Sequence, residues 1–211
     1  MPPADRDPSR AALASPLGAV LQGAWRFALV SVIAFGVWAF AGRWFRDLGE
    51  GVLFAATAVV FVVLAGIVLA PLAPGPDRAS RVSRVYRTFV PAFLVYAIVW
   101  SASWFLLRSH FGEWLASLLG SIAFVGVACS LLGDLRPFAK ASVVFFVAHS
   151  IGYFAGGAVA YALFRLAQDG GLAGLSPAAL AAAGKLAWGL LYGLGFGAGL
   201  GYAFWACRPR S

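Results

Sequence analysis

Six long apolar stretches, separated by short polar segments, make up most of this chain. They cover approximately residues 24–41, 51–72, 88–107, 114–133, 138–164 and 178–206. Each is near or above the roughly 18–20 residues that an α-helix needs to cross a bilayer. Hydrophobic residues make up 62% of the chain and charged residues 11%, whereas soluble domains carry roughly 25% charged residues. We therefore predict an all-α integral membrane protein, folded as a six-helix transmembrane bundle.

One transmembrane domain is expected, over residues 24–207, with a polar tail on each side. Residues 1–23 are rich in Pro and Ala and are interpreted as a mobile tail, with a short turn near residues 17–21. Residues 208–211 form a short C-terminal tail. The pair Ser176-Pro177 is a helix-start signal and opens the last stretch.

The basic residues predict how the bundle is oriented. With the N-terminus inside, eleven Lys and Arg residues fall in inner segments and five in outer segments. Cytoplasmic segments of membrane proteins carry the excess of Lys and Arg, so we expect both termini in the cytoplasm. The abundance of Ala, Gly, Arg and Pro is typical of a GC-rich bacterial gene. The expected location is therefore the bacterial cytoplasmic (inner) membrane, with a multi-pass topology.

An alternative interpretation concerns the first stretch. Arg6, Arg10 and Arg26 precede an apolar run that ends in Ala39-Phe40-Ala41, which has the A-x-A pattern of a signal-peptide cleavage site. A retained helix and a cleaved signal peptide both remain open. A mature protein beginning at Gly42 would rule out the six-helix arrangement.

The charges and cysteines exclude several classes of function. The net charge of +8 indicates contact with anionic lipid headgroups rather than with nucleic acid. All eight Asp and Glu residues fall in tails or between the apolar stretches, so no carboxylate marks an ion path. Cys129 and Cys207 lie in different stretches, and we expect neither a disulfide nor a metal site between them. No cofactor is expected.

Glycine recurs every four residues in the sixth stretch, and the fifth stretch offers a similar small-residue surface. The residues expected to pack helices closely are Gly189, Gly193, Gly197 and Gly201, with Gly152 and Gly156 opposite them. Small residues at this spacing let neighbouring helix backbones approach closely. We predict tight packing between the fifth and sixth helices; the alternatives are a thin-walled seam that flexes and a homodimer interface.

His149 is the one ionisable side chain near the middle of a stretch. At helical spacing it shares a face with Ser142 and Tyr153, and that face includes the small residues. An ionisable residue inside a membrane is a functional candidate. The alternative is a neutral imidazole that is hydrogen-bonded to a Ser or Tyr of a neighbouring helix.

The third stretch carries a polar and aromatic stripe. Tyr96, Trp100 and Ser103 recur at steps of three and four residues, and with His149 they are candidates to line a pocket. Trp100 lies deep enough that its indole N–H needs an acceptor. Lys185, in the sixth stretch, is expected to reach toward the headgroups; holding an anionic ligand at the outer mouth is the alternative role.

Four arginines, Arg78, Arg81, Arg84 and Arg87, precede the third stretch at three-residue steps. This spacing favours an interfacial segment that contacts lipid headgroups, at roughly 1 kcal/mol per basic residue. The same residues serve as a topology signal.

The chain lacks the motifs of common catalytic sites: a phosphate-binding glycine loop, HExxH, G-x-S-x-G or a carboxylate pair. We therefore expect a non-enzymatic membrane protein that binds or passes a small neutral or lipid-like molecule within the helix bundle. One alternative is a structural or assembly subunit of a larger membrane complex. Another is a lipid-modifying membrane enzyme that uses His149.

Overall fold

The computed structural model describes residues 15–42, 44, 48–170, 172 and 174–208, with the side chains of Glu50 and Phe54 excepted. Over these residues the chain is helical and has no β-strand beyond one isolated bridge. Six helices are long and apolar enough to cross a membrane. The prediction of an all-helical chain with six such helices is confirmed. Residues 1–14 and 209–211 of the predicted tails lie outside the described residues.

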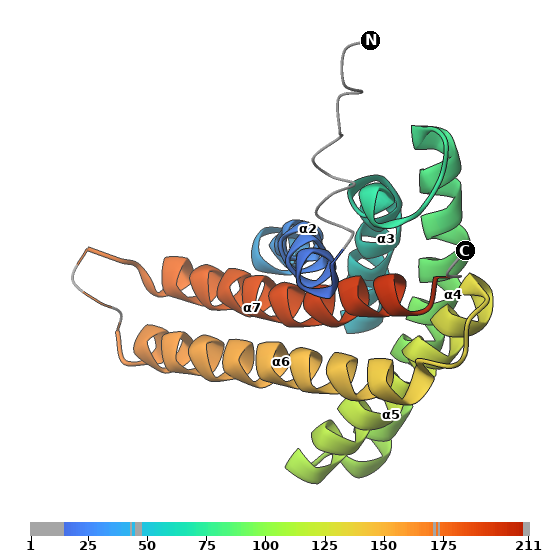
Figure 1. Cartoon of the computed structure of the whole chain (residues 1–211). Helices are drawn as coiled ribbons and strands as arrows, with labels where there is room; N and C mark the ends of the chain where they lie inside the picture. The colour runs from blue at the N-terminus through green and yellow to red at the C-terminus, as the bar shows by residue number, and fades with distance from the viewer. Residues whose placement is uncertain (1–14, 43, 45–47, 171, 173, 209–211) are drawn as a thin grey trace.

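The helices follow one another with short connections (Figure 1). In chain order they are α2 (Pro16–Gly36), the π-helical turn η1 (Val37–Ala41), α3 (Glu50–Val68), the 3-10 turn η3 (Ala70–Leu72), α4 (Arg78–Leu107), α5 (His110–Leu132), α6 (Phe138–Gln168) and α7 (Pro177–Ala206).

Two helices begin well before the apolar stretches do. The Ser15 side chain accepts a hydrogen bond from the Gly18 N–H, so α2 starts at Pro16 and includes the residues expected to form a turn in the tail. The Asp77 carboxylate accepts from the Ser80 N–H at 2.8 Å, and α4 starts at Arg78. The backbone and side-chain hydrogen bonds from Ser80 lower the pKa of Asp77. Such caps satisfy N–H groups that hydropathy does not register.

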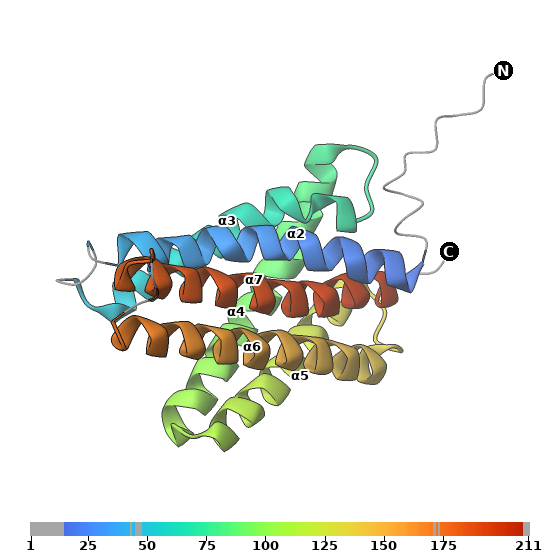
Figure 2. The same cartoon turned by 90° about the vertical axis from the view of Figure 1, so that its left-hand side faces the viewer.

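The helix α7 occupies the centre of one layer. It packs between α2 and α6 (Figures 1 and 2). The helices α4 and α5 pair with each other, α5 also packs on α6, and α3 contacts both α2 and α4. The six helices therefore close into a ring whose α2–α7–α6 side is the most tightly packed.

Both ends of the helical chain lie at one end of the bundle (Figure 2). There α2 begins and α7 ends; we call this the proximal end. Because the helices alternate in direction, α4 and α6 also begin there. We call the opposite end, where α3, α5 and α7 begin, the distal end.

A cluster of phenylalanines joins five of the helices. Phe27 of α2, Phe89 of α4, Phe124 of α5, Phe145 of α6 and Phe196 of α7 are all fully buried. The Phe27 and Phe196 ring centroids are 4.7 Å apart, as are those of Phe124 and Phe145. Offset and edge-on aromatic pairs of this kind stabilise a core beyond the area they bury.

The glycine stripe of α7 faces α2, where the sequence predicted α6. A Cβ on Gly193 would lie 2.6 Å from Ala28 Cα, and one on Gly197 would meet the Gly23 backbone. Gly189 faces the Phe35 side chain, and Gly201 faces Ala19.

The surface of α7 that meets α6 carries a second set of glycines. Gly195 and Gly199 face Ala148, Gly152 and Phe145. Gly156 of α6 faces Trp188. The helix α7 therefore has two small-residue faces, and spacing alone cannot say which neighbour covers each.

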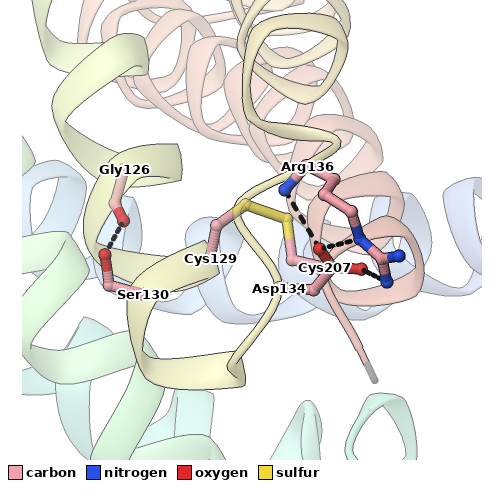
Figure 3. The surroundings of a disulfide bond; sticks show 6 residues. All are labelled: Gly126, Cys129, Ser130, Asp134, Arg136 and Cys207. Carbon is pink, nitrogen blue, oxygen red and sulfur yellow. Dashed lines mark hydrogen bonds and ion pairs between the residues drawn. A yellow bond between two sulfur atoms is a disulfide. The ribbon is translucent and has the colours of Figure 1, made fainter. Parts of the chain in front are cut away.

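A disulfide joins Cys129 of α5 to Cys207 at the end of α7 (Figure 3). The expectation of no disulfide is therefore wrong. The two cysteines are 78 residues apart in sequence, but α5 and α7 both end at the proximal end, and their Cα atoms are 5.0 Å apart. Beside the disulfide, Arg136 donates to both carboxylate oxygens of Asp134, and this pairing raises the pKa of Arg136.

Candidate functional site

The distal half of the bundle encloses a cavity of about 490 Å³, which is partly open. Its walls come from α2, η1, α3, α4, α6 and α7. The lining residues are Phe35, Trp38, Leu53, Thr57, Phe61, Tyr96, Ala97, Trp100, Ser101, Trp104, Phe105, Tyr153, Trp188 and Tyr192. We call it the aromatic cavity. Its volume falls within the roughly 300–1,000 Å³ of small-molecule sites.

One wall is a regular stripe on α4. Tyr96, Trp100 and Trp104 follow one another at four-residue steps and so lie on one face of the helix. Ala97 and Ser101 lie next to this stripe and also line the cavity. Their small side chains leave the space that the rings surround.

The distal halves of α3 and α4 both contribute residues to the cavity wall. Nearer the proximal end these helices touch, and the Tyr86 hydroxyl donates to the Val63 carbonyl oxygen at 2.7 Å. Further toward the distal end, Thr57 of α3 and Ser101 of α4 both line the cavity. Phe105, at the distal edge, is 61% exposed. The mouth of the cavity therefore lies beside Phe105, near the distal end of α4.

No lining residue carries a formal charge. The Thr57 hydroxyl donates to the Leu53 carbonyl oxygen at 2.9 Å, so its one donor is already used within its own helix. The hydroxyl groups of Tyr96 and Tyr153 form hydrogen bonds with His149 and Glu113, respectively, and neither partner lines the cavity. A cavity with these walls suits an apolar or aromatic molecule and gives no counter-charge to an ion.

Behind the inner wall, the Tyr96 hydroxyl lies 2.7 Å from Nε2 of His149. His149 is fully buried and is not among the lining residues. Its Nδ1 has no hydrogen-bond partner within the described part of the chain. A neutral imidazole has one donor and one acceptor nitrogen, so it can exchange one hydrogen bond with Tyr96 in either tautomer. The imidazole thus supports the wall from behind rather than facing a ligand.

Tyr153 connects the cavity wall to a carboxylate near the distal surface. Its hydroxyl donates to Glu113 Oε1 at 3.5 Å, and Glu113 Oε2 lies 3.0 Å from His110 Nδ1. The sequence placed Glu113 between stretches, but α5 begins at His110 because Ser109 caps it, and Glu113 lies in the first helical turn. The serine cap was the signal that would have placed it there.

The predicted lining residues divide into two groups. Tyr96, Trp100 and Tyr153 line the aromatic cavity. Ser142 is buried outside it, and the Ser103 hydroxyl donates to the Val99 carbonyl oxygen of its own helix. The Trp100 indole N–H is buried without a partner among the described residues.

Sequence reasoning missed most of the wall. Phe35, Trp38, Phe61, Trp188 and Tyr192 line the cavity from α2, η1, α3 and α7. Every apolar stretch carries aromatic residues, so composition gave no signal for which of them face inward. Trp188 and Tyr192 do lie four residues apart on α7, away from the glycine stripe, and that spacing could have placed them on one face of the helix.

Lys185 lines a second, more open cavity of about 470 Å³ at the distal end. The other lining residues are Trp38, Phe164, Ala167, Gln168, Pro177 and Ala181. We call it the lysine cavity. The Lys185 ammonium donates to the Trp38 carbonyl oxygen at 3.3 Å and lies 4.8 Å from the centre of the Trp38 ring.

The four arginines predicted to meet headgroups lie in the first three turns of α4, at the proximal end. Arg78, Arg84 and Arg87 are exposed, and Arg81 is half-buried against Gly75. The segment is continuous with the long helix α4.

Among the described residues, no group of three or more His, Cys, Asp or Glu side chains is placed to hold a metal ion. Comparisons with protein families, with curated proteins and with solved structures find no match to this chain. The aromatic cavity is therefore the feature from which a function has to be argued.

Proposed function

We propose that this chain is a multi-pass membrane protein that binds a small neutral or lipid-like molecule in the aromatic cavity. The observation that carries the proposal is the cavity itself: about 490 Å³, walled by ten aromatic side chains and free of formal charge. Binding sites of this kind are mostly apolar and owe their specificity to a few polar groups.

The proposed orientation follows from the charged residues at the two ends. Arg78, Arg81, Arg84, Arg87, Arg136 and Lys140 all lie at the proximal end. Cytoplasmic ends of membrane proteins carry an excess of Lys and Arg, so the proximal end, where α2 begins and α7 ends, faces the cytoplasm. A bacterial inner membrane fits the composition. The aromatic cavity then lies in the outer half of the bilayer.

The position of the mouth favours access from the lipid. Thr57 of α3 and Ser101 of α4 both line the cavity, and the exposed Phe105 lies at its distal edge. A ligand dissolved in the outer leaflet can enter beside Phe105 without crossing a charged surface. A water-soluble ion would gain nothing in this cavity to offset its desolvation.

His149 has no part in this proposal as a reactive group. It is fully buried behind Tyr96, and a general base must come within hydrogen-bond reach of the substrate. A lipid-modifying reaction at His149 would require Tyr96 to move away first. The glycine stripe likewise offers no free surface to a second copy, because α2 already covers it.

The test is mass spectrometry of the protein purified gently from membranes, with two variants of α4. Ala97→Phe places a ring in the aromatic cavity, whereas Ala102→Phe places the same ring on an exposed position of the same helix. We expect a defined small molecule or lipid on the wild type and on Ala102→Phe, and about tenfold lower occupancy in Ala97→Phe. No bound molecule on the folded wild type, or equal occupancy in both variants, would overturn the proposal.

A further inference from the structure

The aromatic cavity and the lysine cavity are neighbours that share one residue. Trp38 of η1 lines both of them. On α7, Lys185 lines the lysine cavity and Trp188, three residues later, lines the aromatic cavity. Residues three apart on a helix lie side by side, so the two cavities are adjacent along α7 as well as at Trp38.

The two cavities differ in charge. The aromatic cavity has none, whereas the lysine cavity contains the Lys185 ammonium and the Gln168 side chain. No carboxylate among the described residues pairs with Lys185; its one hydrogen bond goes to the Trp38 carbonyl oxygen. An ammonium has three donors, so at least two of them remain for a ligand.

Lys185 lies near the distal end of α7. It lies eight residues after Pro177, the first residue of α7, which corresponds to about 12 Å along the helix. A lysine at this depth reaches toward the headgroups, and here its side chain lies along Trp38. The lysine cavity and the aromatic cavity therefore adjoin each other at Trp38.

We infer that the ligand is a single anionic amphiphile, with its apolar chain in the aromatic cavity and its phosphate or carboxylate headgroup on Lys185. Trp38 lies between the two parts of the molecule. This inference rests on the proposed function, which requires only that the aromatic cavity be filled. It adds the headgroup chemistry and the residue that recognises it.

The experiment titrates the purified full chain in detergent with two lipids that share the same acyl chains, and measures binding by native mass spectrometry. The probes are dioleoyl phosphatidylglycerol and dioleoylglycerol. We expect the phosphatidylglycerol to bind roughly tenfold more tightly, because a charge-assisted hydrogen bond forms only with its phosphate. Lys185→Gln should remove this preference and leave dioleoylglycerol binding unchanged, while Lys185→Arg should keep it.

The controls separate this inference from the proposed function. Lys140→Gln removes an exposed lysine at the other end of the bundle and should keep the preference. Glycerol 3-phosphate alone should not compete; if it does, the site takes a free anion, and the amphiphile is wrong. Binding of both lipids with equal affinity in the wild type would overturn the headgroup assignment alone. Binding of neither would overturn the proposed function as well.

Discussion

The Tyr96 hydroxyl and Nε2 of His149 are 2.7 Å apart; Tyr96 lines the inner wall of the aromatic cavity, and the buried His149 lies directly behind it. His149 belongs to α6 and Tyr96 to α4, so the hydrogen bond joins two helices. The pair therefore ties α4 to α6, beside ring contacts such as that between Phe93 and Phe196, which join α4 to α7.

Tyr96→Phe should lower the free energy of unfolding by about 1–3 kcal/mol, because the imidazole is left buried without a partner. Tyr161→Phe is the matched control, since Tyr161 is 60% exposed, and it should change stability little. Thermal unfolding in detergent measures both. Equal melting temperatures for the two variants would show that the Tyr96–His149 hydrogen bond does not hold the wall.

Gly193→Leu should strongly destabilise the fold. A Cβ at this position meets Ala28 Cα at 2.6 Å, and the backbones of α2 and α7 cannot separate without opening the core. Gly36→Leu, at a glycine with nothing within 4 Å of the added Cβ, should be tolerated. Yield of monodisperse protein and melting temperature compare the two. A stable Gly193→Leu protein would contradict the packing of α2 on α7.

The disulfide predicts a specific labelling pattern. Cys129 and Cys207 are both fully buried, so native protein should not react with a maleimide. Denatured protein should react only after reduction. Cys129→Ser frees Cys207 and should make the denatured chain reactive without a reductant. Labelling of denatured, unreduced wild type would show that the two thiols are not joined.

The proposed orientation is tested by cysteine accessibility in a chain whose own cysteines are replaced by serine. Ser83→Cys lies near the proximal end and Ala178→Cys near the distal end, both exposed. In intact cells a membrane-impermeant maleimide should label the residue at 178 and spare the one at 83. Labelling after permeabilisation controls for reactivity. The opposite pattern would invert the bundle and place the aromatic cavity in the inner leaflet.

The positions of the six helices were predictable because each is an apolar stretch long enough to cross a bilayer. The starts of three helices were less predictable, because Ser15, Asp77 and Ser109 cap them outside the predicted apolar stretches. Cys129 and Cys207 are close because α5 and α7 end at the same end of the bundle and lie near each other there. The sequence does not show which helix ends are neighbours.

The cavity was predictable only in part. The four-residue stripe of Tyr96 and Trp100 indicated an inward aromatic face, because period 3.6 assigns residues to one side of a helix. Which other helices complete the wall depends on how α3 is placed against α4, and no sequence pattern in α3 encodes it. His149 was expected to be buried and is, but its neighbour Tyr96 separates it from the cavity.

The most direct test of the central claim is photo-crosslinking of the membrane-embedded protein with a lipid that carries a diazirine on its acyl chain. Mass spectrometry then locates the modified residues on α4. Our account predicts crosslinks at Ala97 and Ser101, which line the aromatic cavity, and their loss when Ala97→Phe fills it. Crosslinks confined to outward-facing residues such as Ile98, which is 68% exposed, would contradict it.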